Sequence, residues 1–96
     1  MSNDMAQRRQ WYEAVTERDR GRCQYSGCRY AGEEVHHVLT KGSRIDLKFN
    51  LDNSILLCAE HHRYAMDNSQ DFKAWFIERY PDRAAAIGLV TKPDFT

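Results

Sequence analysis

The metal-ligand spacing of the cysteines and one histidine is the sequence feature that most constrains the fold. Cys23 and Cys28 form a C-x4-C pair, and Cys58 and His61 form a C-x2-H pair. Structural Zn²⁺ sites favour four tetrahedral sulfur and nitrogen ligands, which two close pairs on separate turns supply with little strain. The alternative is that the cysteines are small buried thiols beside an incidental histidine. The spacing favours a structural zinc held by Cys23, Cys28, Cys58 and His61.

The length and composition fit such a site. A chain of 96 residues is one domain with a limited core, so a metal ion joining two segments would supply part of its folding free energy. Three cysteines without an apolar export signal favour thiolates in a reducing compartment, and no apolar run is long enough to span a membrane. We therefore expect a cytoplasmic protein. A net charge of zero argues weakly against a large nonspecific nucleic-acid surface but leaves room for a local one.

The order of the predicted elements indicates an α+β fold. Periodicity, capping residues and breakers predict helices and strands that alternate with short turns. The predicted helices cover residues 2–20, 59–67, 68–80 and 82–87, and the predicted strands cover 33–39 and 54–57, with a loop over 40–50. Aromatic side chains at helical spacing in 68–80 are typical of a core-facing stripe.

Three histidines remain once His61 is assigned to zinc. His36 and His37 are adjacent in a predicted strand, so their side chains point to opposite faces and suit two roles, one metal ligand and one base. His62 lies in the first turn of a predicted helix, where the partial positive charge disfavours a second positive charge. This position suits a neutral imidazole that binds a metal ion.

These residues together resemble a known family. The order C-x4-C, E-V-H-H-V, D-N-S-I-L-L-C and C-x2-H-H is similar to that of the HNH endonucleases, also called ββα-metal or His-Me finger nucleases, in the zinc-stabilised form of small phage and prokaryotic proteins. The resemblance covers about residues 20–66. It implies one nuclease domain over residues 1–96, with a small ββα-metal core and a structural zinc, flanked by an N-terminal helix and C-terminal helices, in the cytoplasm of a phage-infected or other prokaryotic cell.

The resemblance also implies roles for individual residues. His37 would be the general base that activates water, and His36 and His62 would bind the catalytic divalent ion. Asn53 would brace the loop that orients His37. The expected activity is metal-dependent hydrolysis of DNA phosphodiester bonds, by nicking or double-strand cleavage, leaving 5′-phosphate and 3′-hydroxyl ends.

Two departures from the family pattern affect the metal sites. His61 stands where relatives often have Cys, so zinc could instead use His62 and leave His61 for catalysis; Asn53 and the final histidine pair favour His62 as the catalytic residue. Ala65 and Met66 occupy positions where some relatives carry a third ligand. Water and substrate oxygens would then complete the shell, which suits Mg²⁺ or Mn²⁺, with Ni²⁺ as a further candidate.

The predicted partner is DNA, and the protein that binds it is expected to be a monomer or a weak dimer. No membrane is expected to take part. Four cations in or beside the loop and the following helix are candidate phosphate contacts, against the alternative of plain solvated charges. They are Lys41, Arg44, Lys48 and Arg63. Two other functions stay open: a hydrolase of small phosphoesters, and a noncatalytic zinc module that binds nucleic acid or protein. The zinc module leaves His36, His37 and Asn53 unexplained.

Overall fold

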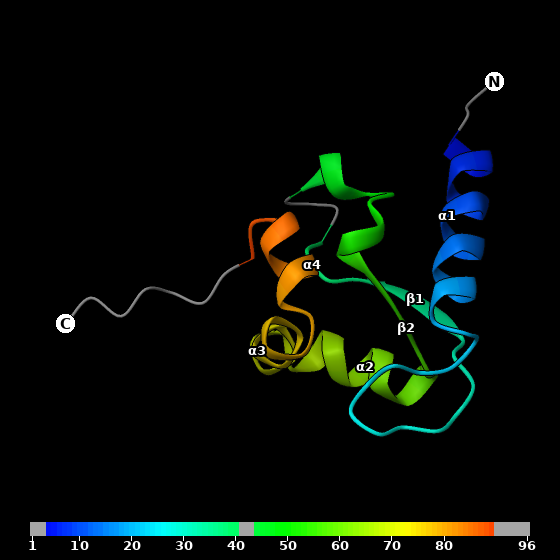
Figure 1. The fold of residues 1–96 in the computed structure, drawn as a ribbon. Coiled ribbons are helices and arrows are strands. Elements are labelled where there is room, and N and C mark those ends of the chain that lie inside the picture. Colours follow the sequence, from blue (N-terminus) through cyan, green and yellow to red (C-terminus); the bar gives the residue numbers. More distant parts are fainter. Residues whose placement is uncertain (1–3, 41–43, 90–96) are drawn as a thin grey trace.

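The computed structural model describes residues 4–40 and 44–89, which form a small α+β fold of four α-helices and a two-stranded antiparallel sheet. Helix α1 lies on one side of the sheet, and α2, α3 and α4 lie together on the other (Figure 1). The elements are α1 (Asp4–Arg18), β1 (Glu34–His37), the 3₁₀ helices η1 (Ile45–Leu47) and η2 (Leu51–Asn53), β2 (Ser54–Leu57), α2 (Ala59–Asp67), α3 (Ser69–Arg79) and α4 (Pro81–Ala86).

The register of the sheet divides the hydrophobic core into two layers. Val35 pairs with Leu56, and His36 pairs with Ile55. Because side chains alternate along a strand, Leu56 packs with Trp11 and Val15 of α1, whereas Ile55 packs with the aromatic side chains of α3. Consecutive residues of β1 therefore face different helices, and this alternation decides where the histidines point.

Helix α1 is fastened to the outer edge of β2. The buried carboxylate of Asp19 accepts the backbone N–H of Leu56 at 3.0 Å, and the guanidinium of Arg18 donates to the Ser54 carbonyl at 2.8 Å. The Leu56 carbonyl accepts from the backbone N–H of Gln24 at 3.0 Å. These bonds satisfy backbone groups that an edge strand would otherwise leave unpaired. Helix α1 is consequently part of the same packed unit as the hairpin.

The predicted elements agree with the structure in type, and differ mainly in length. The second strand and the following helix have the predicted bounds, but β1 ends at His37 rather than at Leu39. The backbone N–H groups of Val38 and Leu39 bond Asn53 instead of β2, at 3.0 and 2.7 Å, which stops the ladder. The predicted loop contains η1, and the predicted helix start at residues 2–3 lies outside the described residues.

No helix in the described part of the chain is both long enough and apolar enough to span a membrane.

Candidate functional site

Three cysteines and one histidine form a cluster that could hold a metal ion such as zinc. The ligand atoms of Cys23, Cys28, Cys58 and His61 all lie within 4.8 Å of one another. Nδ1 of His61 lies 3.5 Å from Sγ of Cys23 and 3.3 Å from Sγ of Cys58. A tetrahedral ion with typical Zn–S and Zn–N bonds separates such a pair by about 3.5 Å. The donor set and its spacing therefore fit zinc, with Nδ1 as the nitrogen ligand.

Local backbone geometry brings the four ligands together. Cys28 donates its N–H to the Tyr25 carbonyl at 2.8 Å across a turn in which Gly27 has a left-handed φ of 75°. This turn places Cys23 and Cys28 on one side of a loop. Cys58 caps the N-terminus of α2, where its sulfur accepts the His61 N–H at 3.4 Å. The cluster thus joins the segment before β1 to the start of α2.

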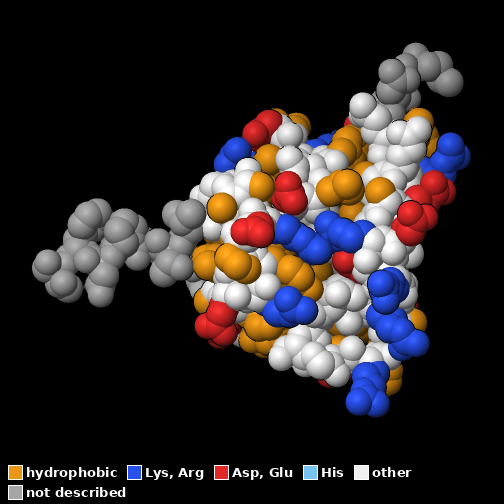
Figure 2. Space-filling view, in the orientation of Figure 1, with side chains coloured by type: hydrophobic (Ala, Val, Ile, Leu, Met, Phe, Trp, Pro, Cys, Tyr) orange, Lys and Arg blue, Asp and Glu red, His pale blue; other side chains and the backbone are white. Residues whose placement is uncertain are grey.

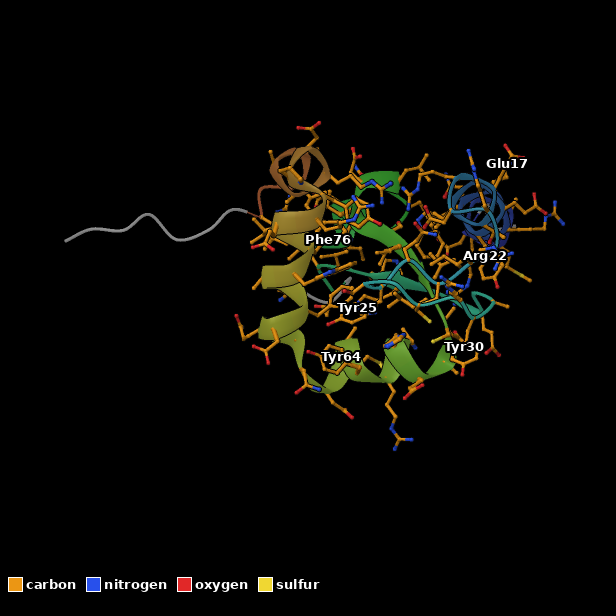
Figure 3. The ribbon with its side chains drawn as sticks, turned by 60° about the horizontal axis from the view of Figure 1, so that its bottom comes forward. Glu17, Arg22, Tyr25, Tyr30, Tyr64 and Phe76 are labelled. Atoms are coloured by element: carbon orange, nitrogen blue, oxygen red, sulfur yellow. The ribbon has the colours of Figure 1, made fainter. Side chains whose placement is uncertain are left out.

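The surroundings of the cluster are apolar and aromatic. The ring of Tyr25 lies 4.8 Å from that of His61 and 5.5 Å from that of Tyr64. In Figure 3, Tyr25 lies at the centre of the molecule with Tyr64 below it on α2. Burial raises the pKa of the Cys23 thiol to about 11. A cation would have to displace that proton, so metal affinity at this cluster must rise with pH.

His36 and His62 face each other on the side of the sheet that carries α2 and α3. Their ring centres are 5.2 Å apart and the ring planes cross at 75°. Two imidazoles that bind one ion through nitrogens at about 2.1 Å have ring centres roughly 4.5 to 5.5 Å apart. Burial, then the nearby charge of His62, lowers the pKa of His36 to about 4. His36 is therefore neutral near pH 7, the form that binds metals.

His37 points to the other side of the sheet, toward α1. Its ring stacks on that of Trp11, with ring centres 4.7 Å apart and planes 14° apart. Nε2 of His37 lies 2.8 Å from the Lys48 carbonyl. Because a carbonyl can only accept, this contact places the proton on Nε2 and makes Nδ1 the acceptor nitrogen.

All three of these histidines nevertheless line one open cleft. The cleft has a volume of about 200 Å³, and Thr40 and Met66 also line it. Val35 lines it too, so three consecutive residues of β1 reach the cleft, which runs along the edge of β1 that does not pair with β2. His61, in contrast, points to the cysteines. The structure thus places the consecutive His61 and His62 in different sites.

Asn53 ties together the two ends of the long connection between the strands. Its side chain is fully buried. Oδ1 accepts the Leu39 N–H at 2.7 Å, and Nδ2 donates to the carbonyls of Leu39 at 3.0 Å and Leu47 at 3.3 Å. Leu47 precedes Lys48, whose carbonyl holds His37. Asn53 therefore supports the segment that carries this carbonyl.

The predicted phosphate contacts have different surroundings. Arg44 forms a bidentate ion pair with Asp46, in which the shorter N···O distance is 3.0 Å. Lys48 forms an ion pair with Asp4 at 2.9 Å. Arg63 is highly exposed and lies 4.0 Å from Asp67. Lys41 lies outside the described residues. On the face shown in Figure 2, Lys and Arg side chains form separate groups interspersed with Asp and Glu.

Two further residues beside the histidines were not predicted as functional. Lys73 of α3 lines a neighbouring pocket together with His36 and His37. It follows Phe72, whose ring meets that of His36 edge-on with centres 5.2 Å apart. The aromatic stripe of α3 was therefore the sequence feature that could have placed Lys73 near the histidines. The other is Trp11, which the sequence marks only as an apolar residue of the first helix.

Comparisons of the chain with protein-family models, curated proteins and solved structures give no match.

Proposed function

We propose that this protein is a metal-dependent endonuclease that hydrolyses DNA phosphodiester bonds, with His37 as the general base. The observation that carries the proposal is one cleft lined by His36, His37 and His62 at the junction of a β-hairpin and a helix. A Cys₃His cluster lies at the start of the same helix. This combination agrees with the resemblance of the sequence to HNH nucleases.

His36 and His62 are the residues that would hold the catalytic ion, since their rings approach in a geometry that two ligands of one ion can adopt. A divalent ion bound there would act as a Lewis acid on the scissile phosphate and on the leaving oxygen. Within the described residues, the only group of three or more His, Cys, Asp or Glu side chains close enough to share an ion is the Cys₃His cluster. Two histidines alone leave coordination positions for water and substrate: the imidazole nitrogens suit Ni²⁺, and the oxygen ligands in the remaining positions suit Mg²⁺ or Mn²⁺.

His37 would take a proton from the attacking water. The Lys48 carbonyl holds the Nε2–H, so Nδ1 is the nitrogen that accepts the proton. Histidine suits this role because the unperturbed pKa of imidazole, about 6.5, allows it to take up and release protons near neutral pH. The water oxygen would bond to phosphorus as the bond to the 3′ oxygen breaks, and the 3′ oxygen would take a proton from solvent water, which gives 5′-phosphate and 3′-hydroxyl ends.

The shape and charge of the cleft favour a polymeric substrate. The cleft is open to solvent, as access by a long DNA strand requires, and it lies beside Lys73, which lines the adjoining pocket. A cation at this position can contact a phosphate that flanks the scissile bond. We therefore include Lys73 with Arg63 among the candidate phosphate contacts.

Cleavage of supercoiled plasmid tests the proposal. Purified protein with Mg²⁺, Mn²⁺ or Ni²⁺ should nick the plasmid, and His37→Ala should reduce the rate by about 10² to 10⁴-fold, since general-base assistance is worth that much. Met66→Ala is a matched control because Met66 lines the same cleft but is 58% exposed and has no proposed role. Equal activity in His37→Ala and wild type would contradict the assignment, and absence of cleavage would favour a noncatalytic zinc module.

A further inference from the structure

The imidazole ring of His37 needs two constraints if it is to present one nitrogen to a reacting water. The hydrogen bond from Nε2 to the Lys48 carbonyl fixes one point of the ring. The ring is also attached to the backbone through Cβ, so the motion that this bond leaves is rotation about the line from Cβ to Nε2, which tilts the ring plane. A contact with the face of the ring restrains that rotation.

Trp11 supplies that second constraint from helix α1. Its ring lies nearly parallel to that of His37, at an angle of 14° with centres 4.7 Å apart, which is the separation of stacked aromatic pairs. The stack restrains the ring plane, whereas the hydrogen bond acts within that plane. The two contacts come from different parts of the chain and restrict different motions.

Trp11 is itself held firmly. The indole N–H donates to Oγ of Ser54 at 2.6 Å, and that hydroxyl donates to the Asn50 carbonyl at 2.7 Å. The ring of Phe49 meets the indole edge-on, with centres 6.0 Å apart. Trp11 is 6% exposed and Ser54 is fully buried. The stacking surface offered to His37 is therefore locked in place.

Helix α1 is tied to the hairpin on both sides of Trp11. Tyr12 donates its hydroxyl to the Glu33 carbonyl at 3.0 Å, just before β1. Arg18 donates to the carbonyls of Leu51 and Ser54, at 2.8 Å each. Lys48, whose carbonyl holds His37, pairs through its ammonium group with Asp4 at the start of the helix. Both constraints on His37 are thus connected to α1.

We infer that Trp11 is a positioning residue that fixes the ring plane of His37, which makes helix α1 an integral part of the candidate active site. The stack itself is independent of any activity, but its catalytic consequence rests on the proposed function. Loss of the stack should affect the chemical step more than DNA binding, because Trp11 is not among the candidate phosphate contacts. The expected kinetic signature is a lower kcat with an unchanged KM.

Two substitutions and a control test the inference. Trp11→Leu removes the stacking face, and Trp11→Phe retains an aromatic face without the indole N–H. Val15→Ala is the matched control, because Val15 is fully buried in the same cluster on the same helix but is not among the ring contacts of His37. All measurements are made at a temperature at which every variant is folded, as shown by circular dichroism.

The first readout is the NMR resonances of the ring CH protons of His37, assigned by comparison with His37→Ala. The ring current of Trp11 should shift them in the wild type and in Val15→Ala, and the shift should disappear in Trp11→Leu. The second readout is plasmid nicking. Misplacement of a catalytic group typically lowers the reaction rate by up to about 10²-fold. We therefore expect kcat of Trp11→Leu to fall roughly 10- to 100-fold with KM unchanged. Trp11→Phe should recover most of that loss.

Unchanged His37 resonances in Trp11→Leu would overturn the inference, as would an equal fall in kcat for Val15→Ala. If the wild-type protein cleaves no DNA, the proposed nuclease function fails. The NMR shifts then decide separately whether Trp11 stacks on His37 in solution.

Discussion

His61 and His62 are neighbours on α2, yet they belong to two sites of opposite character. His61 joins three cysteines, of which Cys23 and Cys58 are buried, and the cluster offers four donors to one ion. His62 meets His36 at an open cleft where a pair of imidazoles offers two donors. Structural zinc sites are closed by four protein ligands, whereas catalytic sites keep positions for water and substrate. The Cys₃His cluster therefore suits a stabilising role, and the open cleft suits the catalytic role that we propose, within a single helical turn.

The geometry of the helix explains how adjacent residues can serve separate sites. Successive side chains on an α-helix are about 100° apart, so His61 and His62 project in different directions. The turn that carries Cys23 and Cys28 lies against the first direction, and β1 lies against the second. Each site therefore combines α2 with a different earlier segment, and each should respond to its own set of substitutions.

Removal of the metal from the Cys₃His cluster should have the largest effect. Apparent binding free energies for structural zinc in small domains are about 10 to 16 kcal/mol, and this chain has a limited core. We expect a chelator that strips zinc to unfold the protein. Its far-ultraviolet circular dichroism should then show no cooperative thermal transition. A full native melt after verified zinc removal would contradict a stabilising role for the cluster.

Loss of the Asn53 amide should have a smaller effect, which combines a moderate loss of stability with a change at the cleft. Asn53→Ala leaves the part-buried Leu39 N–H without its partner and also removes the donor to the Leu47 carbonyl. Unsatisfied buried groups cost about 1 to 3 kcal/mol each, so we expect a loss of about 2 kcal/mol or more in denaturant unfolding.

The metal content of Asn53→Ala sharpens the comparison. Zinc should remain at one ion per chain, since Asn53 is not among the residues of the cluster. Cleavage should decrease, because the segment that carries the Lys48 carbonyl loses its support. Loss of zinc in this variant would show that the two sites are not independent.

Substitution of Arg44 should give the smallest effect. The Asp46 carboxylate raises the pKa of Arg44 and already satisfies its guanidinium, so a phosphate would compete with an existing partner. Arg44→Ala should reduce the slope of log affinity against log salt by less than about 1, whereas Asp46→Asn should tighten DNA binding. Arg22→Ala, which removes a cation beside the cysteines, is the control and should leave the slope unchanged. An equal change in the Arg22 variant would mean that DNA covers both regions.

Local signals in the sequence predict much of the fold. Ser54–Leu57 and Ala59–Asp67 have the predicted type and bounds because an apolar run and the cap at Cys58 specify them locally. The four zinc-spaced residues also come together as predicted. The end of β1 was not predictable in the same way, since it depends on the bonds that Asn53 makes with Leu39, 14 positions earlier in the chain.

Contacts between distant segments account for what the sequence does not reveal about the site. Trp11 and His37 are 26 positions apart by residue number, and no local pattern links them. Lys73 reaches the histidines only because α3 packs beside β1 through Phe72. The sequence also leaves open whether zinc uses His61 or His62, and the direction of each ring in the folded chain distinguishes them.

The most direct test of the two-site account is to measure bound zinc and plasmid nicking together in His61→Ala and His62→Ala. We expect His61→Ala to lose its zinc and its folded structure. His62→Ala should keep one zinc per chain and its native circular dichroism spectrum, but should lose cleavage or need more divalent ion to restore it. Loss of zinc in His62→Ala with zinc retained in His61→Ala would contradict the account.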